Sequence, residues 1–162
     1  EGISLHRSFH EEDRMKKIIF SFLFVMVASI SFSQDVRNSY WGDSKQKVIA
    51  SVGSPNYVEN VEKGTLTYKL DLGDNIKRDL VYIFDKSGKL YSVTIGLLYD
   101  EYDQAKSDFE AEYGPFNEYR FQTCYRKLNE RTVLMLKAQK HDAWGAMIYL
   151  STKYMKENNI NF

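Results

Sequence analysis

A short helix signal that ends in glycine, followed by a run of strand signals, occurs twice in this chain. Shifting the first pattern by 61 positions aligns four pairs of residues, which are Trp41 with Tyr102, Val48 with Phe109, Val52 with Tyr113, and Gly53 with Gly114. An aromatic entry, two core positions and a glycine stop therefore coincide, which indicates an internal duplication. The pattern predicts two similar helix-plus-sheet units, repeat one at about 40–98 and repeat two at about 99–154.

The first helix is predicted to begin after Asp43 and to end at Gly53. Asp43 can cap the helix, and Gln46, three residues later, can return the capping-box contact. Val48 lies on its apolar face. Gly53 suits the left-handed position after the last turn, and Pro55 forbids continuation, so the helix is short and clearly bounded.

The second helix is predicted from Asp100 to Tyr113, before the Gly114-Pro115 stop, and it is rich in acids. Its carboxylates are Asp100, Glu101, Asp103, Asp108, Glu110 and Glu112. A cation site or a general acid–base pair is one interpretation of this cluster. Most of the acids lie outside the apolar stripe, however, so the pattern favours a solvated helix face.

Strand signals follow each helix. They are Thr65–Leu72, Leu80–Asp85 and Lys89–Leu98 in the first half, and Tyr119–Lys127, Arg131–Lys140 and Trp144–Lys153 in the second, with Tyr57–Val61 as a further short candidate. Gly88 suits the positive-φ position of a three-residue hairpin loop. Loops this short join antiparallel strands, because parallel strands need crossovers of a dozen or more residues. We therefore expect an α+β fold, a duplicated α–βββ unit forming a six-stranded antiparallel sheet with two helices packed on one face.

The strand patterns also predict which side chains face the core. In Thr65–Leu72 the even positions are apolar and should point inward, whereas Lys69 and Asp71 should face solvent. The stretch Val133–Leu136 is apolar on both parities. Either this strand lies under cover on both faces, or its second face carries an exposed apolar patch that marks a partner.

The stretch 15–33 is typical of a secretory signal peptide. It opens with a methionine and two lysines, continues with apolar residues 18–30, and ends with Ser31 and Ser33 at the −3 and −1 positions before Gln34. An uncleaved membrane anchor is the less favoured alternative, because a span needs about 20 apolar residues. We expect an exported protein, periplasmic or extracellular, with no membrane span after cleavage.

Three segments follow from this interpretation. Residues 1–14 precede the methionine and are expected to be an upstream extension outside the native protein, and residues 34–162 then form a single α+β domain. The chain carries 22 basic and 22 acidic residues, so its net charge is zero. This balance gives no electrostatic argument for a nucleic acid or an anionic lipid surface as partner.

Motifs that would carry catalysis, cofactor binding or metal binding are missing from the sequence. It contains no HExxH, GxSxG, CxxC, P-loop or GxGxxG pattern, so we expect no catalytic, cofactor or metal residues and no enzyme activity. Cys124, His141 and Asp142 supply the residue types of a nucleophilic triad, but the last two are adjacent in a predicted turn, and an ordinary strand cysteine is favoured. If it is exposed, this lone cysteine could instead pair with another chain. The 71–75 loop resembles fragments of a calcium loop without the required spacing.

Aromatic side chains are abundant. All 12 tyrosines and both tryptophans lie beyond residue 33. The propensity of tyrosine for half-buried sheet surfaces explains much of this, but tyrosine and tryptophan are also enriched where proteins meet partners. Trp144, Met147 and Tyr149 in the last strand are the predicted interaction surface.

Residues 41–55 follow the pattern W-G-x-S-x-x-x-V-x-x-x-x-G-x-P, ahead of the strands. This pattern and the repeated layout resemble exported tandem helix-plus-antiparallel-sheet proteins, namely the β-lactamase-inhibitor-protein-like fold and the small outer-membrane-assembly lipoproteins. The resemblance implies a fold and carries no functional residues. The lipidated cysteine of those lipoproteins is missing here, so neither a membrane tether nor membership of an assembly complex is implied.

These observations predict an exported, non-enzymatic cell-envelope module that binds a protein or peptide through the helix-free face of its sheet or through its hairpin tips. One alternative is a small-ligand-binding protein or enzyme with a pocket between helices and sheet. Another is a structural subunit of an envelope complex. The sequence gives no indication of the oligomeric state.

Overall fold

The structure is a computed structural model, and it describes residues 35–53, 57–60, 62–71, 77–120, 123–139 and 144–161. Several sequence-based predictions lie outside these ranges. They are the upstream extension, the signal peptide, His141 and Asp142 of the suggested triad, and the centre of the 71–75 loop.

The described residues form eight strands in one sheet, with the order β1-β2-β3-β4-β8-β7-β6-β5. The strands are β1 (Tyr57–Asn60), β2 (Thr65–Asp71), β3 (Lys77–Phe84), β4 (Leu90–Leu98), β5 (Asn117–Arg120), β6 (Thr123–Lys127), β7 (Thr132–Gln139) and β8 (Trp144–Ser151). Every neighbouring pair is antiparallel. The predicted α+β class with an antiparallel sheet is therefore confirmed.

The predicted count of six strands is wrong, because each half contributes four. The short candidate at the start of the first half is a real edge strand, β1. The predicted strand Tyr119–Lys127 is two strands, β5 and β6, which pair antiparallel with a register shift between Glu118 and Arg120. Residues 119–127 contain no glycine or proline, so no local turn signal separates the two strands in the sequence.

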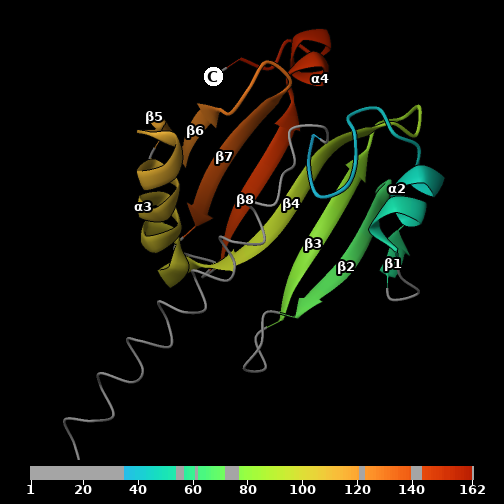
Figure 1. The fold of residues 1–162 in the computed structure, drawn as a ribbon, viewed down its shortest axis with the longest axis horizontal. Helices are drawn as coiled ribbons and strands as arrows, with labels where there is room; N and C mark the ends of the chain where they lie inside the picture. The colour runs from blue at the N-terminus through green and yellow to red at the C-terminus, as the bar shows by residue number, and fades with distance from the viewer. Residues whose placement is uncertain are drawn as a thin grey trace, which may run out of the picture.

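Two helices lie on one face of the sheet, toward its opposite ends (Figure 1). They are α2 (Lys45–Val52), beside β1 and β2, and α3 (Tyr102–Tyr113), beside β5 to β7, with the 3₁₀ turn η1 (Tyr99–Glu101) leading into α3. A third helix, α4 (Thr152–Glu157), replaces the predicted end of the last strand. Ser151 starts it, since its hydroxyl accepts a hydrogen bond from the Tyr154 N–H at 3.4 Å.

The aligned glycines do end both helices. The Gly53 N–H donates to the Ile49 carbonyl, and the Gly114 N–H donates to the Glu110 carbonyl, with φ of 62° and 82°. The N-cap of α2 is Ser44 rather than the predicted Asp43. Asp43 instead accepts from the Tyr40 N–H at 2.9 Å and fixes the turn before the helix.

The core lies between the sheet and the two helices. Its centre is a row of directly paired residues across five strands, which are Leu66, Tyr82, Val93, Tyr149 and Leu134. Val48 of α2 and Phe109 of α3 pack in the same cluster. The predicted alternation in the first strand is confirmed, because Leu66 is buried whereas Lys69 and Asp71 are exposed.

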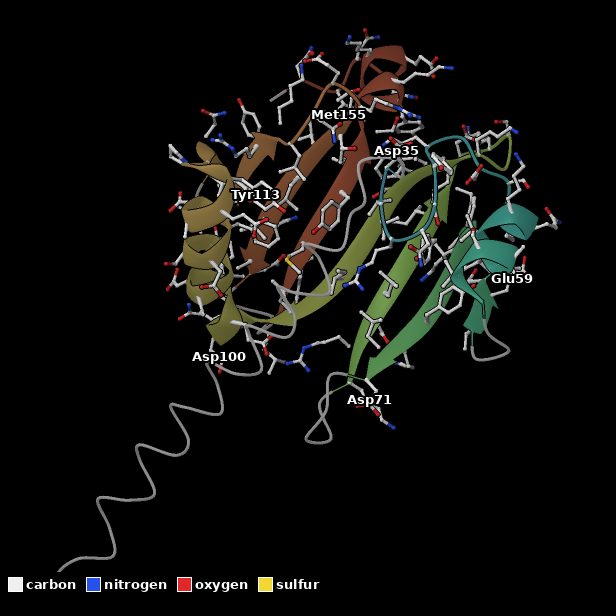
Figure 2. All side chains as sticks on the ribbon, in the orientation of Figure 1. Asp35, Glu59, Asp71, Asp100, Tyr113 and Met155 are labelled. Carbon is white, nitrogen blue, oxygen red and sulfur yellow. The ribbon has the colours of Figure 1, made fainter. Side chains whose placement is uncertain are left out.

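The segment Asp35–Ser39 lies in the space between α2 and α3 (Figure 1). Asp35, labelled in Figure 2, is 5 % exposed, and its carboxylate accepts from the Trp41 N–H at 2.8 Å and pairs with Arg131 at 2.8 Å. The Tyr82 hydroxyl donates to the Arg37 carbonyl at 3.3 Å. The segment thus contacts Tyr82 of the first half and Arg131 of the second.

None of the helices in the described ranges has the length and apolar character needed to cross a bilayer.

Candidate functional site

The predicted interaction residues do not form one surface. Met147 and Tyr149 are 0 % and 1 % exposed and belong to the core, on the helix-bearing face of β8. Trp144 is half-buried and lies on the opposite face. Positions separated by an odd number of residues along a strand point to opposite faces, so Trp144 cannot share a face with the other two. A partner can reach only Trp144 of the three without opening the core.

The face of the sheet opposite α2 and α3, which we call the outer face, carries a continuous line of uncharged side chains. We call this line the outer row; its members are Val58, Thr67, Val81, Thr94, Ile148, Met135 and Tyr125. Each is the direct register partner of the next, so the row runs across seven strands from β1 to β6. Side chains paired in this way are close enough to touch along the row.

The outer row is accessible. Val58 is 68 % exposed, and the other members are half-buried, as is usual for side chains that shield one another on a pleated surface. The stretch Val133–Leu136 is apolar on both faces of its strand, and the two faces have different surroundings. Leu134 and Leu136 are buried against the helices, and Met135 faces outward in the row. On the second face of β7, Met135 is half-buried between Lys137 and the buried Val133, so this face is partly apolar and partly accessible.

Charged side chains border the outer row on one side. Lys69 and Asp79 sit directly opposite each other, two residues along their strands from row members, and form an ion pair. Lys137 occupies the equivalent place on β7, and its Nζ lies 5.5 Å from the centre of the Trp144 ring. Protein-binding surfaces commonly have a less charged centre and a polar, charged rim, and the outer row with its charged edge has this arrangement.

A cleft of about 400 Å³ opens at one end of the sheet, and we call it the end cleft. It is lined by the β3–β4 hairpin, the start of α4, Arg131 and the Trp41-Gly42 turn. This is a different place from the predicted pocket between helices and sheet. No local pattern in the sequence indicates the end cleft, because its lining comes from four segments that are distant along the chain.

The walls of the end cleft are fixed by specific contacts. The rings of Tyr91 and Tyr154 stack with centroids 3.8 Å apart and planes 15° apart. The Trp41 indole N–H donates to the Thr132 hydroxyl at 3.0 Å. Burial, and then the neighbouring Tyr154, raise the pKa of Tyr91 above its usual value, so at neutral pH its hydroxyl keeps its proton.

Asp85 is the acid of the hairpin that lines the end cleft. Its Oδ1 accepts from the Ser87 N–H at 2.8 Å, the Ser87 hydroxyl at 2.7 Å and the Lys89 N–H at 2.9 Å. Desolvation alone would raise the pKa of Asp85, but these hydrogen bonds outweigh it and lower the pKa below its usual value. The carboxylate therefore stays charged and is held by its own turn.

Two buried tyrosines meet on the helix-bearing face beside Arg37. Desolvation raises the pKa of Tyr82 and of Tyr149 far above the usual value, with the Arg37 charge opposing it in both cases. The Tyr82 hydroxyl donates to the Arg37 carbonyl, whereas the Tyr149 hydroxyl has no hydrogen-bond partner among the residues that the structure describes. Both hydroxyls therefore keep their protons at neutral pH, and both side chains belong to the buried core.

The other candidate residues have structural contacts. Cys124 is 1 % exposed, and its sulfur lies 3.5 Å from the Tyr102 hydroxyl. Near α3, Glu101 pairs with Arg78 and accepts from the Leu98 N–H at 2.7 Å, and Glu110 accepts from the Phe116 N–H at 3.2 Å. Among the residues that the structure describes, no group of three or more histidines, cysteines and acids is arranged to hold a metal ion.

Comparison of the chain with protein-family models, with curated proteins and with solved structures finds no match. The two accessible features described above, the outer row and the end cleft, suit different kinds of ligand. The outer row can bury apolar area against another macromolecule, and the end cleft can hold a small molecule beside charged side chains.

Proposed function

We propose that this protein is an exported, non-enzymatic interaction module of the cell envelope that binds a protein or peptide partner through the outer row. The observation that carries the proposal is the uninterrupted line of uncharged side chains across seven strands, on the face opposite α2 and α3. Export is supported by the leader pattern at residues 15–33.

Binding through this row would be driven by burial of apolar area. Ile148, Met135 and Tyr125 are adjacent in the row. Full burial of an exposed side chain of this size contributes about 1.5–3 kcal/mol, so completing the burial of a half-buried one contributes about half of that, before the entropy lost on association is subtracted. Three such side chains in line can therefore form the centre of an interface.

The charged edge would give the interface its orientation. Lys69, Asp79 and Lys137 stand on one side of the row, whereas Lys127 stands on the other, so a partner whose charges complement this uneven distribution is preferred in a single direction. Charges at the rim of an interface act mainly on specificity and association rate rather than on affinity.

Site-specific photo-crosslinking in cells tests the proposal. A photoreactive residue at position 135 is expected to give one discrete crosslinked product, and Ile148→Asn in the same chain should abolish it. The matched control is the same photoreactive residue at position 79, which lies on the same face but in the charged edge. Equal products from both positions, or a product from position 135 that persists with Ile148→Asn, would contradict binding through the row.

The repeated layout supports a second part of the proposal. We infer that the two halves arose by duplication, because each consists of a helix followed by four strands and because the aligned glycines end both helices. A tandem origin of this kind favours kinship with the exported helix-plus-sheet proteins that the sequence resembles. Far-UV and near-UV circular dichroism of the half 35–98, expressed alone and mixed with the half 99–161, tests whether each half is a folding unit.

A further inference from the structure

We propose that the end cleft binds a small organic anion, a carboxylate- or phosphate-bearing molecule about the size of one substituted ring. This inference is independent of the proposed function, since the cleft lies at the end of the sheet and includes no member of the outer row. Its volume of about 400 Å³ falls within the range of small-molecule sites, about 300–1,000 Å³.

The positive charge of the cleft comes from three different segments. Lys89 belongs to the β3–β4 hairpin, Arg131 to the turn before β7, and Lys153 to α4. Because none of the three is a sequence neighbour of another, only the tertiary fold brings them to the same opening. The chain as a whole is neutral, so this grouping is a local property of the cleft.

Two of these cations keep free hydrogen-bonding capacity. Arg131 uses Nη2 to pair with Asp35 at 2.8 Å, but its side chain is 60 % exposed, and a guanidinium carries five N–H donors in a fork that suits carboxylates and phosphates. Lys89 forms no ion pair with any residue that the structure describes. An incoming anion can therefore bind Lys89 and Arg131 without displacing a partner.

Two acids also line the cleft, and each has a partner of its own. Asp85 directs Oδ1 into its own hairpin, where it accepts three hydrogen bonds. Glu157 faces Lys153 on the same helix at 3.8 Å. Arg131 in turn pairs with Asp35, so among the cations that line the cleft only Lys89, on the hairpin wall, has no ion pair with a residue that the structure describes.

Aromatic side chains supply the apolar part of the cleft. The stacked pair Tyr91–Tyr154 forms one wall, and Trp41 is held in place by its hydrogen bond to Thr132. Rings that are fixed before binding lose little entropy when a ligand packs on them. A fixed aromatic wall beside Lys89 and the exposed guanidinium of Arg131 favours an anionic group carried on a ring over a bare inorganic ion.

The experiment uses the intrinsic fluorescence of Trp41. The chain has two tryptophans, so Trp144→Phe leaves Trp41 as the single reporter in the cleft. Purified Trp144→Phe protein is titrated with benzoate, with glucuronate and with inorganic phosphate. We expect saturable changes with at least one of the two ring-bearing acids, at lower concentration than with phosphate, and a loss of affinity when ionic strength rises from about 0.05 to about 0.5 M.

Variants then test the assigned cations. Lys89→Ala should weaken binding about tenfold, the loss expected when one charged hydrogen bond is removed. Arg131→Gln should weaken anion binding at least as much. That change also removes the contact with Asp35, so Lys89→Ala is the more direct test of the cleft cations. The matched control is Lys47→Ala, an exposed lysine of α2 outside the cleft. Its affinity should equal that of the parent.

Three results would overturn the inference. One is the absence of a saturable change with all three probes. Another is equal affinity in the Lys89→Ala and Lys47→Ala proteins. The third is binding of phosphate as tight as that of the ring-bearing acids, which would remove the role of the aromatic wall.

Discussion

The two halves of the sheet have the same order of elements but different outer surfaces. In the first half the outer face presents mostly polar and charged side chains, which are Thr65, Thr67, Lys69, Asp71, Lys77 and Asp79 together with Val81 and Ile83. In the second half β7 and β8 present mostly apolar ones, which are Val133, Met135, Trp144, Ala146, Ile148 and Leu150 together with Lys137 and Gln139, and of these Val133 and Ala146 are buried. The shared layout reflects folding, and the proposed binding through the outer row depends on the difference in surface.

The halves also differ in how their helices are anchored. The helix α2 has eight residues and a single buried side chain, Val48. The helix α3 has twelve residues and buries Tyr102, Ala105 and Phe109. Phe109 additionally contacts the rings of Tyr113 and Phe116, at 5.7 and 6.4 Å between centroids. We infer that the second half is the more strongly packed of the two.

The largest expected effect tests this difference in anchoring. Phe109→Ala should lower the free energy of unfolding by about 3–5 kcal/mol, because it removes a buried ring and leaves a cavity. Val48→Ala, its counterpart in α2, should lower it by about 2 kcal/mol, because fewer buried carbons are lost. Urea unfolding followed by circular dichroism measures both. Equal losses would show that the halves are anchored alike.

The next effect concerns the glycines that end the helices. Gly114→Ala should destabilise the protein by about 1–3 kcal/mol, since its φ of 82° is strained for alanine and a Cβ would lie 3.1 Å from Arg126 Nη2. Gly53→Ala should have a smaller effect, because its φ is 62° and the space around a Cβ is open. Thermal unfolding of the two variants ranks them, and the reverse order would contradict the role assigned to Arg126.

The buried tyrosines give opposite predictions in the two halves. Tyr149→Phe should leave stability unchanged or raise it by up to about 1 kcal/mol at neutral pH, because the lost hydroxyl is buried without a partner among the described residues. Tyr82→Phe should lower stability by about 1 kcal/mol, because it removes the hydrogen bond to the Arg37 carbonyl. Urea unfolding at pH 7 separates the two, and a loss in Tyr149→Phe would point to a hidden partner of that hydroxyl.

Stability should also fall in alkaline solution. Burial, and then the neighbouring Glu112, raise the pKa of Tyr113 to about 12. In the folded protein the Tyr113 hydroxyl therefore keeps its proton in the pH range in which an unfolded tyrosine, with a pKa of about 10, loses it. The stabilisation is complete below pH 10 and is lost as pH rises from about 10 through about 12. Tyr113→Phe should flatten this part of the pH dependence, measured as the urea midpoint from pH 9 to 12; an unchanged slope would contradict it.

The smallest effect on stability is expected at the outer row. Met135→Gln and, in the first half of the row, Thr67→Gln should each change the free energy of unfolding by less than about 0.5 kcal/mol, as is usual for accessible surface positions. Binding of a hydrophobic dye should nevertheless fall in Met135→Gln and stay unchanged in Thr67→Gln, because only the first removes an apolar side chain. Dye fluorescence at equal protein concentration measures this, and an equal decrease in both would remove the contrast between the halves.

The predictable part of the fold depended on local signals. Gly53 and Gly114 marked both helix ends, and Gly88, with φ of 74°, marked the hairpin between β3 and β4. Alternation correctly assigned Leu66 and Lys69 to opposite faces. These features are set within a few residues of chain, so the sequence specifies them without knowledge of the partners.

The predictions that proved wrong concern features that depend on contacts between segments distant along the chain. Residues 121–122, between β5 and β6, contain neither glycine nor proline, so no local pattern in the sequence marks the change from one strand to the next. Ser151 ends β8 and starts α4, although the strand pattern continues to Lys153. Met147 and Tyr149 could be either surface or core from composition alone, and the positions of α2 and α3 made them core.

By itself, the sequence determined the α+β class, the helix-then-strands order in both halves and the places where helices stop, because periodicity, capping and glycine conformation act over short distances. The tertiary structure alone decided which face of each strand is covered, which residues meet in the outer row, and how Trp41, Lys89, Arg131 and α4 come together around the end cleft. Those arrangements depend on strand register and on contacts between distant segments, which no local pattern encodes.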